Sequence, residues 1–157
     1  MTEEQSPITL QQIEEAMTHS WERMEAILPQ LGGVLDSGPN ESGWTPRQLL
    51  SHLVGSWQRV PLHAAFILAR VHVPVQVADA FWTPEWETAP LPVFRACLQA
   101  GYDANEAFVS RLEPSDLSVS GTTQFGEMTI GELLMLSYSK HFDEDHLPQL
   151  EAFAART

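Results

Sequence analysis

The sequence predicts an all-α protein, a single four-helix bundle domain spanning residues 1–157. Four segments repeat apolar residues every three or four positions, which is the period of an amphipathic helix, whereas strand-like alternation is scarce. Two of these segments open with helix-capping patterns. The length of 157 residues suits one domain with a sizeable core. Four helices of about 20 residues with one long connection describe a bundle.

The first two helices are expected over residues 10–31 and from residue 45 to about 67. In the first, Ile13, Met17 and Trp21 mark the apolar face, and a glycine pair at 32–33 ends it. The second opens with Thr45 as the cap, and with a proline and a glutamine where a capping box needs them. Pro61 lies inside this helix and predicts a kink or a break, because proline removes one backbone hydrogen bond.

The last two helices are expected over residues 92–112 and 129–155, the latter opening with a second capping-box spacing, Thr129 to Glu132. Residues 71–92 have no clear period, so they are interpreted as a long crossover loop whose aromatic residues pack onto the bundle. Loops of this length are uncommon and often cover a functional site. The polar stretch after the third helix, up to residue 128, is also expected to be a loop.

The charge balance argues against two classes of partner. Eight Lys and Arg stand against 21 Asp and Glu, a formal charge of −13. That field repels nucleic acid and disfavours an anionic membrane surface, so neither is expected as a partner. The single cysteine, Cys97, excludes an internal disulfide framework and favours a reducing cytoplasm. Residues 1–8 are acidic and lack the apolar run of a signal peptide.

Three of the six histidines lie near the middle of a predicted helix. On a helical wheel centred on Phe142, His146 falls about 40° to one side and Asp145 about 60° to the other, so both are predicted to point inward. His141 falls about 100° away, at the edge of the buried stripe. His52, on the second helix, faces them across the bundle in this interpretation. Two imidazoles and a carboxylate are a ligand set for a divalent transition metal.

The same wheel predicts an interface. It places Leu133, Leu136 and Leu147 away from the buried stripe, on outer faces of the fourth helix. Apolar residues that gather on an outer face favour association with a second chain. A homodimer is therefore expected.

Two stretches resemble the DinB-like superfamily of four-helix-bundle proteins, which includes thiol-dependent transferases. Residues 43–53, GWTPRQLLSHL, are similar to that family's second-helix opening, W-[ST]-P-x-x-[LV]-L-x-H-L. Residues 125–134, FGEMTIGELL, resemble its turn into the fourth helix, and HLPQL at residues 146–150 its H-x-x-Q-[LI] ending. The resemblance implies a DinB-type bundle with the long connection between helices 2 and 3, and it implies pairing as homodimers.

For metal binding, the resemblance implies ligands at His52 and at an H-x-x-x-H pair in the last helix. The second member of that pair matches His146, but the first falls on Phe142, which cannot bind a metal. Three arrangements remain open. A wide, π-type turn, favoured by Pro148, would bring His141 onto the side of His146. Asp145 could act as the third ligand instead. In the third arrangement, Phe142 fills a metal-free pocket.

Two functions follow from these arrangements. In the first, the protein is a metal-dependent transferase or detoxification enzyme acting on a small molecule, with a thiol as one candidate reactant. Its metal (zinc, nickel or iron) would be held by His52 and His146 together with His141 or Asp145. In the alternative, the chain is a metal-free, non-catalytic binding protein, and Phe142 is the main support for that reading.

Overall fold

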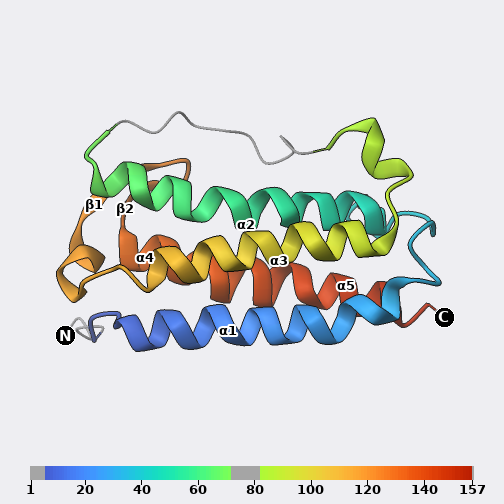
Figure 1. The fold of residues 1–157 in the computed structure, drawn as a ribbon, viewed down its shortest axis with the longest axis horizontal. Helices are drawn as coiled ribbons and strands as arrows, with labels where there is room; N and C mark the ends of the chain where they lie inside the picture. The colour runs from blue at the N-terminus through green and yellow to red at the C-terminus, as the bar shows by residue number, and fades with distance from the viewer. Residues whose placement is uncertain (1–5, 72–81, 157) are drawn as a thin grey trace.

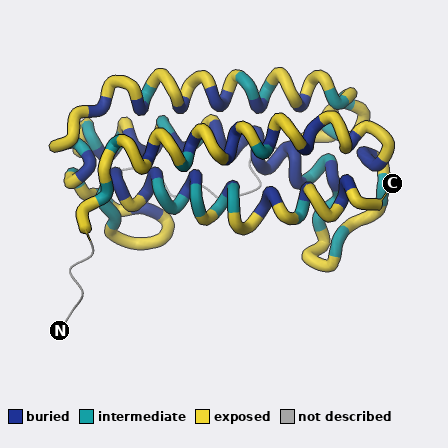
Figure 2. The backbone as a smooth tube through the Cα atoms, turned by 90° about the horizontal axis from the view of Figure 1, so that it is seen from below, coloured by how far each residue is buried: buried dark blue, intermediate teal, exposed yellow. Residues whose placement is uncertain are grey.

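A computed structural model of the chain describes residues 6–71 and 82–156. Four long helical rods lie side by side in the described part (Figure 1), which confirms the predicted all-α bundle. The rods are α1 (Leu10–Ile27), α2 (Pro46–Leu68), α3 (Leu91–Val109) and a composite fourth rod. Figure 2 shows that each rod turns its buried residues inward and its exposed residues outward.

The fourth rod changes its helical type along its length. It begins as α4 (Ile130–Met135), continues as a π-helix, η4 (Leu136–His146), and ends as α5 (Leu147–Ala154). Within it, the backbone N–H of Leu147 donates to the carbonyl of Phe142, five residues earlier. Pro148, in the first turn of α5, has no N–H to donate to the carbonyl of Glu144. The wide turn predicted from Pro148 is therefore present.

The predicted helix starts are confirmed. Thr9, Thr45 and Thr129 each cap a helix in a capping box, paired with Gln12, Gln48 or Glu132 three residues later. Helix α2 runs without a break through Pro61, so a stop and restart at this proline is wrong. A short 3₁₀ turn, η1 (Leu28–Leu31), follows α1 before the glycine pair.

Helices α2 and α3 run in the same direction (Figure 1), which agrees with a long connection between them. Residues 72–81, in the middle of the predicted crossover loop, lie outside the described residues. The rest of the connection includes the 3₁₀ turn η2 (Pro84–Glu87), where Trp86 stacks on Phe94 of α3 with ring centroids 4.9 Å apart. This contact confirms the expected packing of Trp86 on the bundle.

The stretch predicted as a polar loop after α3 is more ordered than expected. It contains a 3₁₀ turn, η3 (Pro114–Ser118), and a hairpin of β1 (Ser120–Thr123) and β2 (Gly126–Thr129), which pair antiparallel from Ser120–Thr129 to Thr123–Gly126. Gly126 adopts φ +102°, a conformation that favours glycine. Strands of four residues are too short to show a clear apolar alternation, which explains the error.

Aromatic side chains fill the middle of the core. Trp57 of α2 is fully buried and stacks on Phe142, with ring centroids 4.3 Å apart and planes 1° from parallel. Tyr138 also stacks on Trp57, with ring centroids 5.6 Å apart, and donates its hydroxyl hydrogen to Asn105 Oδ1 of α3. A Cβ at Gly101 would stand 2.8 Å from the Trp57 Cβ, so this glycine permits the close approach of α2 and α3.

The outer-face prediction for the fourth rod is wrong at two of its three leucines. Leu133 is 4% exposed and Leu147 is completely buried in the single chain, while Leu136 is half-buried. The π-helical turns advance by less than 100° per residue, so the phase of an ideal α-helix does not carry across Leu136–His146. These leucines therefore give no support to a dimer interface.

Candidate metal centre

Three imidazoles converge between α2 and the fourth rod. His52 comes from the first half of α2, and His141 and His146 both come from η4. The His52 Nε2 atom lies 3.2 Å from His141 Nε2 and 3.1 Å from His146 Nε2. The third side of the triangle, His141 Nε2 to His146 Nε2, measures 3.1 Å. This cluster can hold a metal ion.

The π-helix is the reason that the two histidines of the fourth rod meet. In an α-helix, residues five apart point in directions about 140° apart. In a π-helix, backbone hydrogen bonds join residues i and i+5, so His141 and His146 lie on one side of the rod. The structure thus has the arrangement in which His141, rather than Asp145 or Phe142, stands beside His146.

Hydrogen bonds alone cannot satisfy the triangle. His146 Nδ1 lies 2.9 Å from Gln149 Oε1, an amide oxygen that only accepts. The proton of neutral His146 is therefore on Nδ1, and its Nε2 presents a lone pair to the other two rings. The remaining two Nε2 atoms can supply at most one N–H each, which satisfies two of the three contacts. A cation bound to all three lone pairs satisfies every one.

The size of the triangle also fits a metal. Nitrogens bound to zinc at about 2.0–2.1 Å stand roughly 3.3 Å apart at tetrahedral angles and roughly 2.9 Å apart at right angles. The observed separations of 3.1–3.2 Å fall between these two values. Three protein ligands also leave further coordination positions open, as in catalytic rather than structural zinc sites.

Burial keeps the cluster in the neutral form that a metal requires. His52 and His146 are 6% and 9% exposed, and His141 is half-buried. Burial lowers the pKa of His141 to about 3, and the neighbouring His146, His52 and Arg59 contribute to this, while Asp145 opposes it. Burial also lowers the pKa of His146, against the opposing effects of Gln149 and Asp145. Both rings therefore lose their protons at a lower pH than an ordinary histidine does, and His141 has a pKa of about 3.

Asp145 and Phe142 do not occupy the positions that the sequence suggested. Asp145 is exposed, and its carboxylate accepts a hydrogen bond from Lys140 at 2.7 Å, so the prediction that it points inward is wrong. The cluster that can hold a metal does not include it. Phe142 does not fill the space between the histidines, because its ring stacks on Trp57 in the core. The error at Asp145 comes from applying an α-helical wheel to a π-helix, whereas the Phe142-filled pocket was inferred from the match of Phe142 to the family's H-x-x-x-H pair.

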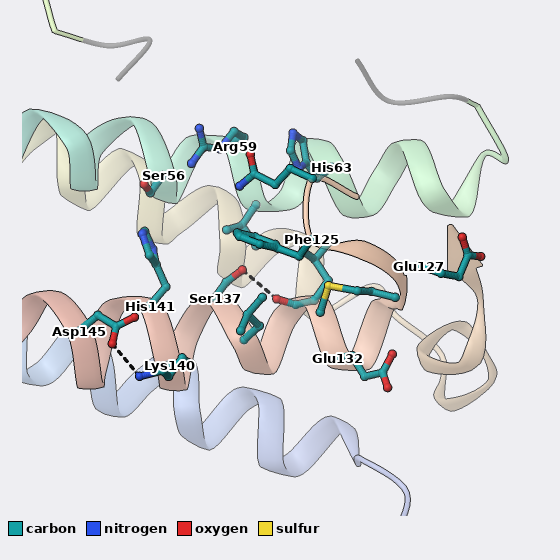
Figure 3. A pocket seen from close by; sticks show the side chains of 15 residues that line it. Ser56, Arg59, His63, Phe125, Glu127, Glu132, Ser137, Lys140, His141 and Asp145 are labelled. Carbon is teal, nitrogen blue, oxygen red and sulfur yellow. Dashed lines mark hydrogen bonds and ion pairs between the residues drawn. The ribbon is translucent and has the colours of Figure 1, made fainter. Parts of the chain in front are cut away.

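Two cavities adjoin the cluster. The larger, of about 610 Å³, lies between α2 and the fourth rod and has His141 in its wall (Figure 3). The smaller, of about 290 Å³, includes His52, Trp44 and Trp82 in its lining. The Trp44 ring lies 4.9 Å from the His52 ring and 6.2 Å from the His146 ring, so this tryptophan covers the cluster from that side.

The sequence reasoning missed the polar lining of the larger cavity. Neither His63 nor Arg59 is among the candidate residues that the sequence predicted. Both line the larger cavity together with Ser56. Residues 52, 56, 59 and 63 share one face of the helix, but this spacing alone does not show that the face lines a cavity.

Comparison of the sequence with protein-family models and with curated proteins finds no match. In structure, the chain is similar to an uncharacterised protein from Escherichia coli UTI89 known from a crystal structure. The TM-score is 0.70 at 14% sequence identity, covering 96% of this chain and 95% of that one. At this identity the likeness concerns the fold alone. In the described part of the chain, no helix combines the length and apolar character needed to cross a bilayer.

Proposed function

We propose that this protein is a DinB-like, metal-dependent enzyme that transfers or detoxifies a small molecule in the cytoplasm. The observation that carries the proposal is the triangle of three Nε2 atoms, 3.1–3.2 Å apart, from two different rods. The resemblance of residues 43–53 and 146–150 to DinB-like motifs supports the same reading. A homodimer remains a prediction that rests on this resemblance.

The chain's own residues would perform three tasks. His52, His141 and His146 hold a divalent metal such as zinc, nickel or iron through their Nε2 atoms. Gln149 fixes the orientation and tautomer of His146. Trp44 shields the cluster from water on one side, while the larger cavity admits a small molecule on the side of His141. The bound metal would act as a Lewis acid that lowers the pKa of a coordinated water or thiol.

The donor set restricts the choice of metal only in part. Neutral imidazoles suit zinc, nickel, iron and copper and are poor partners for magnesium and calcium, which prefer oxygen ligands. Three facial nitrogens at these separations are compatible with four-coordinate and with six-coordinate geometry. Metal analysis therefore has to identify the ion.

Elemental analysis of protein purified without added metal tests the proposal. The wild-type chain should carry close to one equivalent of a transition metal, and His52→Ala should lose it. His19→Ala is the matched control, because His19 is an exposed histidine on α1, outside the cluster. Metal-free wild-type protein that also fails to take up zinc, nickel or iron on reconstitution would rule the proposal out. It would favour the alternative, a non-catalytic binding protein.

A further inference from the structure

The larger cavity has the features of a ligand site beyond the metal centre. Its volume of about 610 Å³ is in the range of small-molecule sites. Figure 3 shows Ser56, Arg59 and His63 along α2, with Ser137, His141 and Lys140 on the fourth rod opposite. The hairpin contributes Phe125, which is 64% exposed. The cavity thus extends from the metal cluster to the hairpin.

Two polar groups in this cavity have no partner in the described part of the chain. The Ser56 hydroxyl is buried and forms no hydrogen bond there. The Arg59 guanidinium, half-buried one turn further along α2, is in none of the ion pairs of the described residues. Burying polar groups costs free energy unless they are hydrogen-bonded or paired. A ligand that accepts hydrogen bonds would satisfy both.

The carboxylates around the cavity are already engaged. Asp145 pairs with Lys140, Glu132 accepts from the backbone N–H of Thr129, and Glu127 accepts from the Thr122 hydroxyl. All three acidic side chains are exposed, so water also solvates them. Among the described residues that line the cavity, the charge without a counter-ion is that of Arg59, which lies close enough to His63 and His141 to lower the pKa of both.

We propose that the cavity binds the carboxylate group of a small organic acid, with Arg59 as its specificity-determining residue. The planar guanidinium matches a carboxylate through two parallel hydrogen bonds, and the Ser56 hydroxyl adds a third donor. One unpaired cation balances one negative charge. A phosphate dianion would meet the same single cation beside exposed acidic groups, in a chain with a net charge of −13.

The rest of the acid meets apolar surface. Val60 and Leu133 are buried in the cavity wall, and Phe125 covers it from the hairpin. This combination of one ionic anchor and apolar walls favours an acid with an aliphatic or aromatic body over a short polyacid. When the carboxylate is bound at Arg59, the body of the acid lies in the same cavity as His141 of the proposed metal centre.

The acid is a substrate only if the proposed function is right, and in that respect this inference rests on it. Binding of the acid itself requires no metal. The test is therefore made on metal-free and on zinc-loaded protein. The probes are propionate, benzoate and phenylacetate, each paired with its neutral amide and compared with inorganic phosphate. Binding is followed by NMR titration of backbone amides and of the Arg59 Nε–H.

At least one carboxylate should bind tenfold or more tightly than its amide and should shift the Arg59 and Ser56 signals. Arg59→Gln should remove this preference, and Arg59→Lys should restore part of it. Arg95→Gln is the matched control for lost charge, because Arg95 is an exposed arginine of α3. Thermal melts and the unperturbed spectrum confirm that each variant is folded.

Several outcomes would overturn the inference. They are equal binding of acids and amides, no binding by any of the three acids, retention of the preference in Arg59→Gln, or tighter binding of phosphate. If the proposal of a metal centre is wrong, the experiment gives a different result. In that case zinc does not bind, while the Arg59-dependent preference for carboxylates persists in metal-free protein. Zinc uptake without any preference for carboxylates would support the metal centre and contradict this inference.

Discussion

At the scale of single residues, one hydrogen bond orients His146 within the histidine cluster. The contact between His146 Nδ1 and Gln149 Oε1 fixes which nitrogen carries the proton and which way the ring faces. Sequence reasoning identified His52 and His146 because each lies beside a recognisable local motif. It could not identify Arg59 or Ser56, because their role depends on the cavity that the opposite rod and the hairpin create.

Replacing Gln149 with leucine should weaken zinc binding by about 10–100-fold, the usual cost of losing a hydrogen-bond partner of a ligating histidine. The dissociation constant would be measured by competition with a chromophoric chelator. The melting temperature of the metal-free protein should change little, since Gln149 is half-buried and the new side chain is apolar. Gln99→Leu, on the exposed face of α3, is the control and should bind zinc as the wild type does. Unchanged affinity in Gln149→Leu would show that this hydrogen bond does not support the centre.

At the scale of elements, the helix starts could be predicted and the phase of the fourth rod could not. The capping boxes at Thr9, Thr45 and Thr129 are local, so the residues that form them are readable within four positions of the chain. The π-helix depends on distant residues as well as on Pro148. The Ser20 hydroxyl of α1 donates to the carbonyl of Tyr138, and Arg23 contacts both the carbonyl and the carboxylate of Asp143.

A double variant distinguishes the π-helix from an α-helix in solution. Phe142→His combined with His141→Ala creates the H-x-x-x-H spacing of an α-helical site, with histidines at 142 and 146. It should bind no stoichiometric zinc, because the side chain at 142 packs against Trp57 in the core. It should also unfold more easily, since replacing a buried phenylalanine removes roughly 3 kcal/mol or more of packing. Phe142→Leu with His141 intact controls for the lost ring and should keep its zinc. Full zinc occupancy in the double variant would mean that residues 136–146 are α-helical.

At the scale of the whole molecule, the histidine cluster joins α2 to the fourth rod, so binding of a metal there would be coupled to folding. The ligands come from positions 52, 141 and 146, far apart in the sequence, and the complete set exists only in the folded chain. The core beside the cluster, where both Tyr138 and Phe142 stack on Trp57, holds these two rods together without metal. The fold should therefore survive metal removal with reduced stability.

Zinc at about 100 times its dissociation constant should stabilise the fold by about 2.7 kcal/mol, a rise of roughly 5–10 °C in melting temperature. A chelator should reverse this rise, and His52→Ala should show none.

Acidification of the metal-free protein gives a separate prediction. His141 has a folded-state pKa of about 3, below its ordinary value of 6.5, and the pKa of His146 is lowered in the same direction. The unfolded chain therefore takes up protons first, so the metal-free protein should lose stability as the pH falls below 6.5. Calorimetry of the metal-free protein at pH 7 and pH 5 should show this loss. Equal stability at the two pH values would contradict the lowered pKa of these histidines.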